Sequence, residues 1–158
     1  MKRTSCTLSA AALLLAVVLL APATPLAAQA GKVPITLDGA PPSPDALFSP
    51  AVRVGDVIFL SGSIGSVPGQ GLVEGGIRAE ARQVILNLER SLQAAGAGLD
   101  DLAKCTVFLA DIGEFAAMNE VWLEMIPSPR PARSTVAVAA LVRDARIEIE
   151  CMAAAPAG

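Results

Sequence analysis

The hydrophobic residues of this chain change their spacing along the sequence, and these changes predict its elements. Ala51–Val54 and Asp56–Ser61 are two extended apolar runs around Gly55, a pattern typical of an antiparallel hairpin. A short strand is expected before them near Val33–Leu37, in an arm that is rich in proline. Residues 61–76 contain six glycines and are expected to form a loop.

Two segments in the middle of the chain have helical spacing. From Ile77 the apolar residues recur at steps of three and four, which predicts a helix of about five turns that Gly96 ends. Its charged residues fall on the opposite side and are expected to face solvent: Arg78, Glu80, Arg82, Glu89 and Arg90. A strand follows at Ala103–Ala110, and a second helix is predicted over Gly113–Ile126.

The last third of the chain predicts two further strands, Arg133–Leu141 and Ala145–Ala153. In the second of these, isoleucines and glutamates alternate, so Glu148 and Glu150 share the face opposite the isoleucines. The order β-β-β-α-β-α-β-β predicts an α+β fold with two helices on one face of a sheet. The other face would carry Thr135, Ala137 and Ala139 or their neighbours. Because such a face is only weakly polar, we expect another chain to cover it.

The first thirty residues have the pattern of an export signal. Lys2 and Arg3 precede an uncharged apolar run from Leu8 to Leu20, and Ala28-Gln29-Ala30 offers a cleavage site of small residues. A membrane anchor is the alternative, but a span needs about 20 apolar residues. We therefore expect residues 1–30 to be a cleaved signal peptide, residues 31–158 to form a single domain, and the protein to be periplasmic or secreted without a stable membrane anchor.

The charge and composition exclude several functions. The chain carries 12 basic and 15 acidic residues, for a net charge of −3, and cleavage would remove Lys2 and Arg3 and leave −5. Nucleic-acid backbones are bound by clustered lysine and arginine, so we expect no nucleic-acid partner. The chain has no histidine and no tyrosine, which excludes a serine–histidine–aspartate triad and an H-E-x-x-H zinc site.

Cys105 and Cys151 remain after cleavage, and each lies in an apolar run that predicts a strand. Such residues are more often small core hydrophobes than catalytic thiols. An oxidising compartment would also allow a disulfide between them, a possibility whose geometry the sequence leaves open.

Three features remain as candidates for chemistry: Arg133, Glu148 and the segment Ser61-Gly62-Ser63 at the end of a predicted strand. Arg133 begins a strand directly after Pro131-Ala132, and its planar guanidinium could grip a carboxylate with two hydrogen bonds. It could equally pair with a surface aspartate or glutamate. A glutamate on a strand, such as Glu148, is most often a solvated residue.

Five segments occur together in this order: Ala46–Asp56, Phe59–Gly62, Cys105–Asp111, Pro131–Val136 (P-A-R-S-T-V) and Ile147–Glu150 (I-E-I-E). With them the chain resembles the RidA (YjgF) family of reactive-intermediate deaminases from about Phe48 to Met152. The resemblance implies a chorismate-mutase-like fold, a homotrimer with a central barrel, and active sites in clefts between subunits. It also implies hydrolysis of enamines and imines, 2-aminoacrylate and 2-imino acids, to 2-keto acids and ammonia, without metal or organic cofactor.

The resemblance further implies roles for individual residues. Arg133 would bind the substrate carboxylate, Glu148 would hold or activate the attacking water, and backbone groups of Thr135 would position the imine nitrogen and the water. Three other positions match cleft residues of the family: Ser61, Asn119 and Phe48. An imine is already electrophilic, so orientation and one general acid or base could supply most of the acceleration. The expected enzyme is a hydrolase of the 2-iminobutanoate/2-iminopropanoate deaminase type.

The chain departs from the family's common pattern at four places. Phe48 replaces a tyrosine, Ser63 a glutamine and Thr135 a cysteine, and the loop over residues 127–130 is about three residues shorter. An alternative hypothesis is therefore a non-enzymatic trimer that binds small carboxylates or proteins in the same arginine cleft. A thiol-based stress protein would rest only on the two cysteines.

Overall fold

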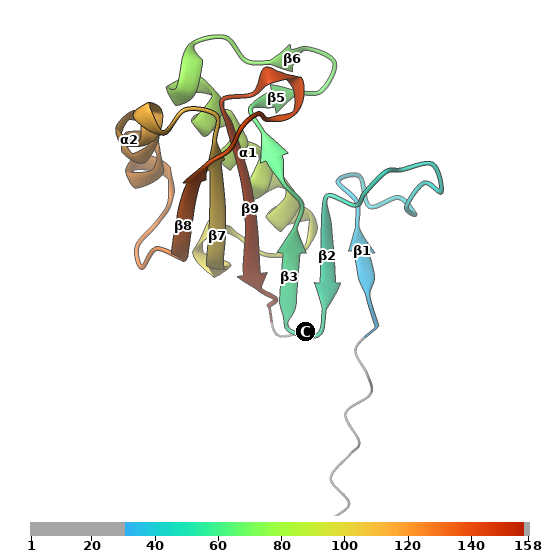
Figure 1. The fold of residues 1–158 in the computed structure, drawn as a ribbon. Helices are drawn as coiled ribbons and strands as arrows, with labels where there is room; N and C mark the ends of the chain where they lie inside the picture. The colour runs from blue at the N-terminus through green and yellow to red at the C-terminus, as the bar shows by residue number, and fades with distance from the viewer. Residues whose placement is uncertain (1–30, 157–158) are drawn as a thin grey trace, which may run out of the picture.

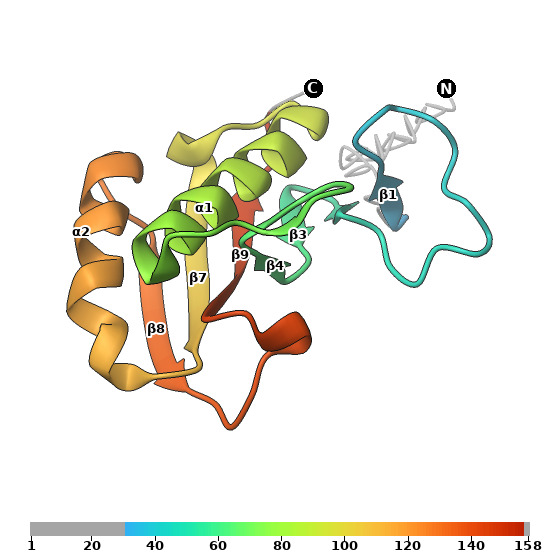
Figure 2. The same ribbon diagram turned by 90° about the horizontal axis from the view of Figure 1, so that it is seen from above.

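The structure is a computed structural model that describes residues 31–156; the predicted export signal lies outside them. One mixed sheet has the strand order β1-β2-β3-β9-β7-β8, and the short strand β4 also pairs with β9. Helices α1 and α2 lie on the same face of this sheet (Figures 1 and 2). This is the α+β architecture that the sequence predicts. The elements are β1 (Val33–Ile35), β2 (Ala51–Val54), β3 (Val57–Leu60), β4 (Ser63–Ile64), β5 (Ser66–Val67), β6 (Gly71–Leu72), α1 (Gly76–Ala94), β7 (Leu102–Leu109), α2 (Phe115–Met125), β8 (Ala132–Ala137) and β9 (Ile147–Ala154), with short 3₁₀ turns η1 (Leu99–Asp101), η2 (Ile112–Glu114) and η3 (Val142–Asp144).

The predicted hairpin is confirmed as β2 and β3. Val54 pairs with Val57, so only Gly55 and Asp56 make the turn, and Gly55 has a φ of 58°. Glycine adopts this left-handed conformation without a steric penalty, which explains why it stands at this tight turn.

The glycine-rich segment 61–76 is more regular than the predicted loop. Strand β3 pairs only with the last residues of β9, so the backbone groups at the start of β9 need another partner. Strand β4 supplies it, with Ser63 opposite Ile149 and Ile64 opposite Glu148. The prediction was wrong here because a two-residue strand has too few side chains to show a period.

The predicted first helix is confirmed as α1, which buries one apolar stripe against the sheet. Glu80 is an exception to the prediction, because it is 5% exposed instead of facing solvent. Its Oε2 accepts a hydrogen bond of 2.8 Å from the backbone N–H of Arg146, just before β9 begins. A buried carboxylate with such a partner ties the helix to the entrance of β9.

Several predicted boundaries differ from the structure, three of them for a visible physical reason. The second helix begins at Phe115 instead of Gly113, because η2 forms its first turn and Asp111 accepts a hydrogen bond from the N–H of Gly113. Strand β8 ends at Ala137 instead of Leu141, since its parallel partner β7 ends opposite it at Leu109. The chain then forms η3, so β9 starts later than predicted, at Ile147.

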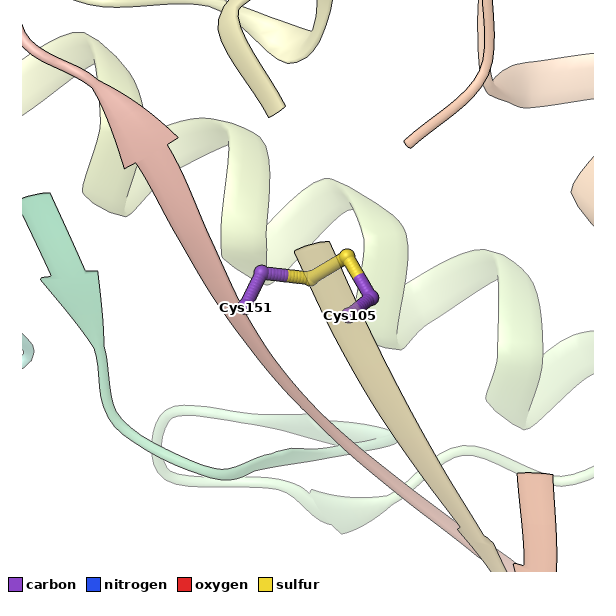
Figure 3. Close-up of a disulfide and its surroundings, with 2 residues drawn as sticks. All are labelled: Cys105 and Cys151. Carbon is purple, nitrogen blue, oxygen red and sulfur yellow. A yellow bond between two sulfur atoms is a disulfide. The ribbon is translucent and has the colours of Figure 1, made fainter. Parts of the chain in front are cut away.

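The predicted alternation along β9 is confirmed. Ile147, Ile149 and Cys151 are buried beneath the helices, whereas Glu148 and Glu150 point toward the opposite face. Cys105 of β7 lies directly opposite Cys151, and the two form a disulfide with Cα atoms 4.1 Å apart (Figure 3). The two cysteines are therefore core residues, as expected, and they form the disulfide that the sequence had left open.

The face of the sheet away from the helices is partly apolar. Val57, Phe59, Val136 and Met152 are each 38–45% exposed there. Lys104 lies among them and donates a hydrogen bond of 2.7 Å to Ser134. The prediction for this face named Thr135 and Ala137 or their neighbours. The neighbours Ser134 and Val136 lie on it, whereas Thr135 and Ala137 lie on the side of β8 that carries Arg133. Within the described residues, no helix is long and apolar enough to cross a membrane.

Candidate functional site

Glu148 lines a hollow in the described part of the chain, with a volume of about 760 Å³. We call this hollow the Glu148 cavity. Its walls come from the proline-rich arm, the segment from Ser61 to Gly69, the middle of α1 and η3. The polar or charged residues lining it are Ser61, Ser63, Ser66, Asn87, Arg90, Ser91, Arg143 and Glu148. Three of the predicted site residues, Phe48, Ser61 and Glu148, thus meet in one cavity.

The position of the Glu148 carboxylate depends on Gly62. A Cβ atom placed on Gly62 would lie 2.0 Å from Oε1 of Glu148 and 3.0 Å from its Cδ. No such contact can exist, so the carboxylate occupies space that any other residue at position 62 would fill. Within residues 31–156 this carboxylate has no ionic partner.

Ser61 and Phe48 are linked through the backbone between them. The Ser61 hydroxyl donates a hydrogen bond of 2.7 Å to the carbonyl of Ser49, and its N–H donates to the carbonyl of Pro50. Ser61 therefore fixes the arm residue that follows Phe48. The Phe48 ring is 67% exposed at the mouth of the cavity, where it can contact a ligand only through its apolar surface.

Asn87 of α1 binds the segment from Ile64 to Ser66, which forms part of the cavity wall. Its amide nitrogen donates to the carbonyls of Ile64 at 3.1 Å and Ser66 at 2.8 Å. These two carbonyls flank Gly65, where the chain turns from β4 into β5. The side chain replaces the backbone partners that two very short strands cannot supply.

Arg133 lies elsewhere, in what we call the Arg133 cluster: Arg133, Met118, Asn119, Trp122 and Phe115. Its guanidinium donates a hydrogen bond of 2.6 Å to the side-chain oxygen of Asn119. The guanidinium carbon also lies 4.8 Å from the centroid of the Trp122 ring and 5.7 Å from the centroid of the Phe115 ring. A weaker contact of 3.9 Å reaches the sulfur of Met118. All four neighbours belong to α2, so the structure brings the predicted residues Arg133 and Asn119 together.

The electrostatics of this cluster suit an anion. No carboxylate of the described residues pairs with Arg133, so the surface ion pair considered from the sequence does not form. Partial burial against α2 lowers the pKa of Arg133, because removal from water disfavours the charged form. An arginine nevertheless stays charged in proteins, and a partly dehydrated guanidinium binds a carboxylate more strongly than an exposed one.

Arg133 and Glu148 extend from opposite faces of the sheet. Arg133 is in register with Cys105, and Thr135 is in register with Val107. Cys105 and Val107 are both fully buried beneath the helices, so Arg133 and Thr135 extend from the helix face of the sheet. Glu148 is in register with Phe108, on the other face. The backbones of Arg133 and Glu148 lie roughly 14 Å apart, because β7 separates their strands and they are offset by three residues along it. One chain therefore holds the predicted site as two separate halves.

The sequence did not single out three residues that shape these halves: Asn87, Arg90 and Arg143. Arg143 lies in a turn, where no period assigns a face, and Asn87 and Arg90 lie on the helix side that was expected to be solvated. No group of three or more aspartate, glutamate or cysteine residues in the described segment is placed to hold a metal ion.

Comparisons with known proteins fit this geometry. The family model described as Endoribonuclease L-PSP matches residues 39–155, which include both halves. A protein of the mite Dermatophagoides farinae named 2-iminobutanoate/2-iminopropanoate deaminase is 44% identical over 110 residues, 69% of this chain and 86% of that protein.

Two solved structures share the fold over most of their length. The crystal structure of RidA from an Antarctic Psychrobacter bacterium has a TM-score of 0.69 and 39% identity, covering 76% of this chain and 97% of that chain. E. coli TdcF, solved with bound serine, has a TM-score of 0.69 and 32% identity, covering 77% of this chain and 98% of that chain.

Proposed function

Because the chain belongs to the RidA (YjgF) family, we propose that it hydrolyses enamine and imine intermediates, 2-aminoacrylate and 2-imino acids, to 2-keto acids and ammonia. One observation carries this proposal: Arg133 and Glu148, the two residues that the reaction needs, both lack an ionic partner within residues 31–156. The names of relatives from mite and goat, both 2-iminobutanoate/2-iminopropanoate deaminase, support an enzyme of this type.

The proposed mechanism uses the two halves in sequence. The guanidinium of Arg133 binds the substrate carboxylate through two parallel hydrogen bonds, which orients the imine carbon. Glu148 accepts a proton as the water oxygen bonds to that carbon and the C=N electron pair moves to nitrogen. The proton then passes to nitrogen, which completes a carbinolamine. Glu148 next transfers the proton of the carbinolamine hydroxyl to the same nitrogen, and the C–N bond breaks so that ammonia leaves as the carbonyl forms. Backbone groups of Thr135 position the nitrogen and the water.

This mechanism requires Arg133 and Glu148 to meet across two chains, since they lie on opposite faces within one. We therefore place the active site between neighbouring copies in a homotrimer. The partly apolar sheet face with Val57, Phe59, Val136 and Met152 supports such an assembly, because an exposed apolar surface of this kind favours contact with another chain. Light scattering at micromolar concentration should give three times the monomer mass, and a monomer would contradict the shared site.

Mixing two inactive variants tests the shared site directly. Arg133→Ala keeps Glu148, and Glu148→Gln keeps Arg133. If each site joins two chains of a closed trimer, random mixing in equal amounts leaves about one quarter of the sites with both native residues. We expect about that fraction of wild-type activity after the chains are unfolded and refolded together. If mass spectrometry shows mixed trimers but activity stays absent, Arg133 and Glu148 do not act across chains.

The activity itself is tested with imines generated in place by an amino-acid oxidase, while keto-acid formation is followed. Wild-type protein should accelerate hydrolysis over buffer and over Arg133→Ala. Binding of 2-oxobutanoate without any acceleration would instead support the alternative of a non-enzymatic carboxylate-binding protein. The net charge of −3 argues against polynucleotide substrates.

We also propose that the protein acts outside the cytosol, in the periplasm or the medium. The predicted signal peptide over residues 1–30 supports this, and so does the disulfide between Cys105 and Cys151, since disulfides persist mainly in oxidising compartments. Mass spectrometry of the protein from cell fractions should find an exported form that begins at Gly31. Exclusive recovery of the full chain from the cytosol would reject the proposal.

A further inference from the structure

Two arginines of the described residues differ from the others. Six of the eight arginines in residues 31–156 donate to an oxygen atom of the chain: Arg53, Arg78, Arg82, Arg130, Arg133 and Arg146. The remaining two, Arg90 and Arg143, make no hydrogen bond or ion pair with those residues. Both line the Glu148 cavity.

The backbone holds Arg143 at this wall in an unusual conformation. Arg143 and Asp144 both have a φ of 59°, in the left-handed region that residues other than glycine seldom adopt. Two hydrogen bonds hold the turn formed by Arg143 and Asp144. The N–H of Ala145 donates to the carbonyl of Val142, and the N–H of Arg146 donates to buried Glu80. Strained residues that are held in this way are concentrated at ligand sites.

Arg90 approaches the cavity from α1, on the turn that follows Asn87. The ionisable side chains lining the cavity are thus two arginines and Glu148, so the cavity carries a local positive charge in a chain whose net charge is −3. An unpaired guanidinium at the wall of a hollow attracts anions and can bind a carboxylate or phosphate with two hydrogen bonds.

The size of the cavity agrees with a ligand longer than a three-carbon imino acid. Its volume of about 760 Å³ lies within the range of about 300–1,000 Å³ that is typical of pockets for drug-sized ligands. If Arg133 of a neighbouring chain binds the α-carboxylate beside Glu148, most of the cavity, including Arg90 and Arg143, faces the substrate side chain.

We propose that the Glu148 cavity selects imino acids whose side chain carries a second anionic group, such as a carboxylate, and that Arg90 and Arg143 bind this group. This inference rests on the proposed deaminase function and names its substrate class. The distal group takes no part in the covalent steps, so Arg90 and Arg143 act only in binding and specificity.

The test compares two substrates that differ by one charge: the imines formed by an amino-acid oxidase from glutamate and from its γ-methyl ester. Wild-type kcat/KM should be at least about tenfold higher for the glutamate imine, as one charged hydrogen-bonded contact accounts for roughly a tenfold effect. This ratio should fall about fivefold to tenfold in Arg90→Gln and in Arg143→Asn. Asparagine is chosen because it tolerates the left-handed backbone.

Arg82→Gln is the matched control, because Arg82 lies on the same helix but pairs with Glu124 of α2, away from the cavity. Its ratio should equal that of the wild type. Equal kcat/KM for the two imines in the wild type, or an unchanged ratio in the Arg90→Gln/Arg143→Asn double variant, would overturn the proposal.

A binding experiment separates this proposal from the deaminase proposal. Calorimetry should show that 2-oxoglutarate binds at least about tenfold more tightly than its 5-methyl ester, and that the double variant loses this preference. If neither imine is hydrolysed but the preference holds, the deaminase function fails and the anion site stands. If imines are hydrolysed without any preference, the reverse is true.

Discussion

The Arg133 cluster and the Glu148 cavity prepare their charged groups in different ways. Arg133 is held before any ligand arrives, by the hydrogen bond that it donates to Asn119 and by two aromatic rings of α2. Glu148 has no such support, and its place depends on the space that Gly62 leaves. The Arg133 guanidinium is thus positioned by contacts, and the Glu148 carboxylate by the space that a Cβ atom at position 62 would fill. Substitutions near Arg133 should therefore weaken binding, whereas substitutions near Glu148 should slow the chemical step.

The largest effect is expected from the charged residues themselves. Glu148→Gln should lower kcat by about 10²–10⁴, the range of general acid–base catalysis, and change KM only slightly. Arg133→Lys keeps the charge but loses the two-pronged geometry, and should mainly raise KM. Steady-state kinetics of imine hydrolysis would check both variants. A KM effect for Glu148→Gln and a kcat effect for Arg133→Lys would reverse the proposed roles.

The disulfide supports both regions, because Cys105 is in register with Arg133 and Cys151 lies three residues after Glu148. It closes a loop with a sequence separation of 46 residues. Replacing both cysteines by alanine should lower the free energy of unfolding by about 2–4 kcal/mol, measured by urea denaturation. A reducing agent should destabilise the wild type similarly and leave the double variant unaffected; equal stability of the two proteins without reductant would contradict the role of the bond.

Gly62→Ala tests whether space alone positions Glu148. The added Cβ meets the end of a flexible side chain, so the carboxylate should move while the fold persists. We expect kcat to fall about tenfold, comparable to a loss of 1.4 kcal/mol, with little change in thermal stability. Glu148→Asp should cost less in the Gly62→Ala background than in the wild type, because the shorter side chain avoids the clash.

Gly98→Ala is the matched control for Gly62→Ala, since nothing lies within 4 Å of a Cβ at Gly98 and its φ is −138°. It should leave kcat unchanged. Strictly additive effects of Gly62→Ala and Glu148→Asp on kcat would show that the two residues do not share this space.

The smallest effect is expected at Asn119. Asn119→Ala removes one hydrogen bond from Arg133 but leaves the aromatic contacts, so KM should rise about fivefold at nearly constant kcat. Asn119→Asp should raise KM further, because the new carboxylate would pair with Arg133 and compete with the substrate. An equal or lower KM for Asn119→Asp would show that Arg133 does not bind the substrate carboxylate.

Most of the fold was predictable from local patterns. The steps of three and four residues identified α1, and the alternation of Ile147, Glu148 and Ile149 assigned both faces of β9. The errors lie where a distant partner decides the structure. Strand β8 ends where β7 ends, β4 forms because β9 has unpaired backbone groups, and Glu80 is buried because the backbone at Arg146 needs an acceptor.

The candidate site was predictable in residue type but not in arrangement. The resemblance named Arg133, Glu148, Ser61, Asn119 and Phe48, yet only the register of β7, β8 and β9 places Arg133 and Glu148 on opposite faces. The helical period placed Arg90 only on the solvent side of α1, and Arg143 lies in a turn without a period, so the tertiary structure alone brings these two arginines to the Glu148 cavity.

The sequence by itself determined both helices and the longer strands, the two helices on one face and the charged residues available for chemistry, because these depend on periodicity and composition. The tertiary structure alone decided which of those residues meet. Pairing between strands sets their faces, and the packing of α2 partly buries Arg133 against two aromatic rings. The two halves of the site therefore follow from the pairing of β7 with β8 and with β9, strands that the chain brings together from separate segments.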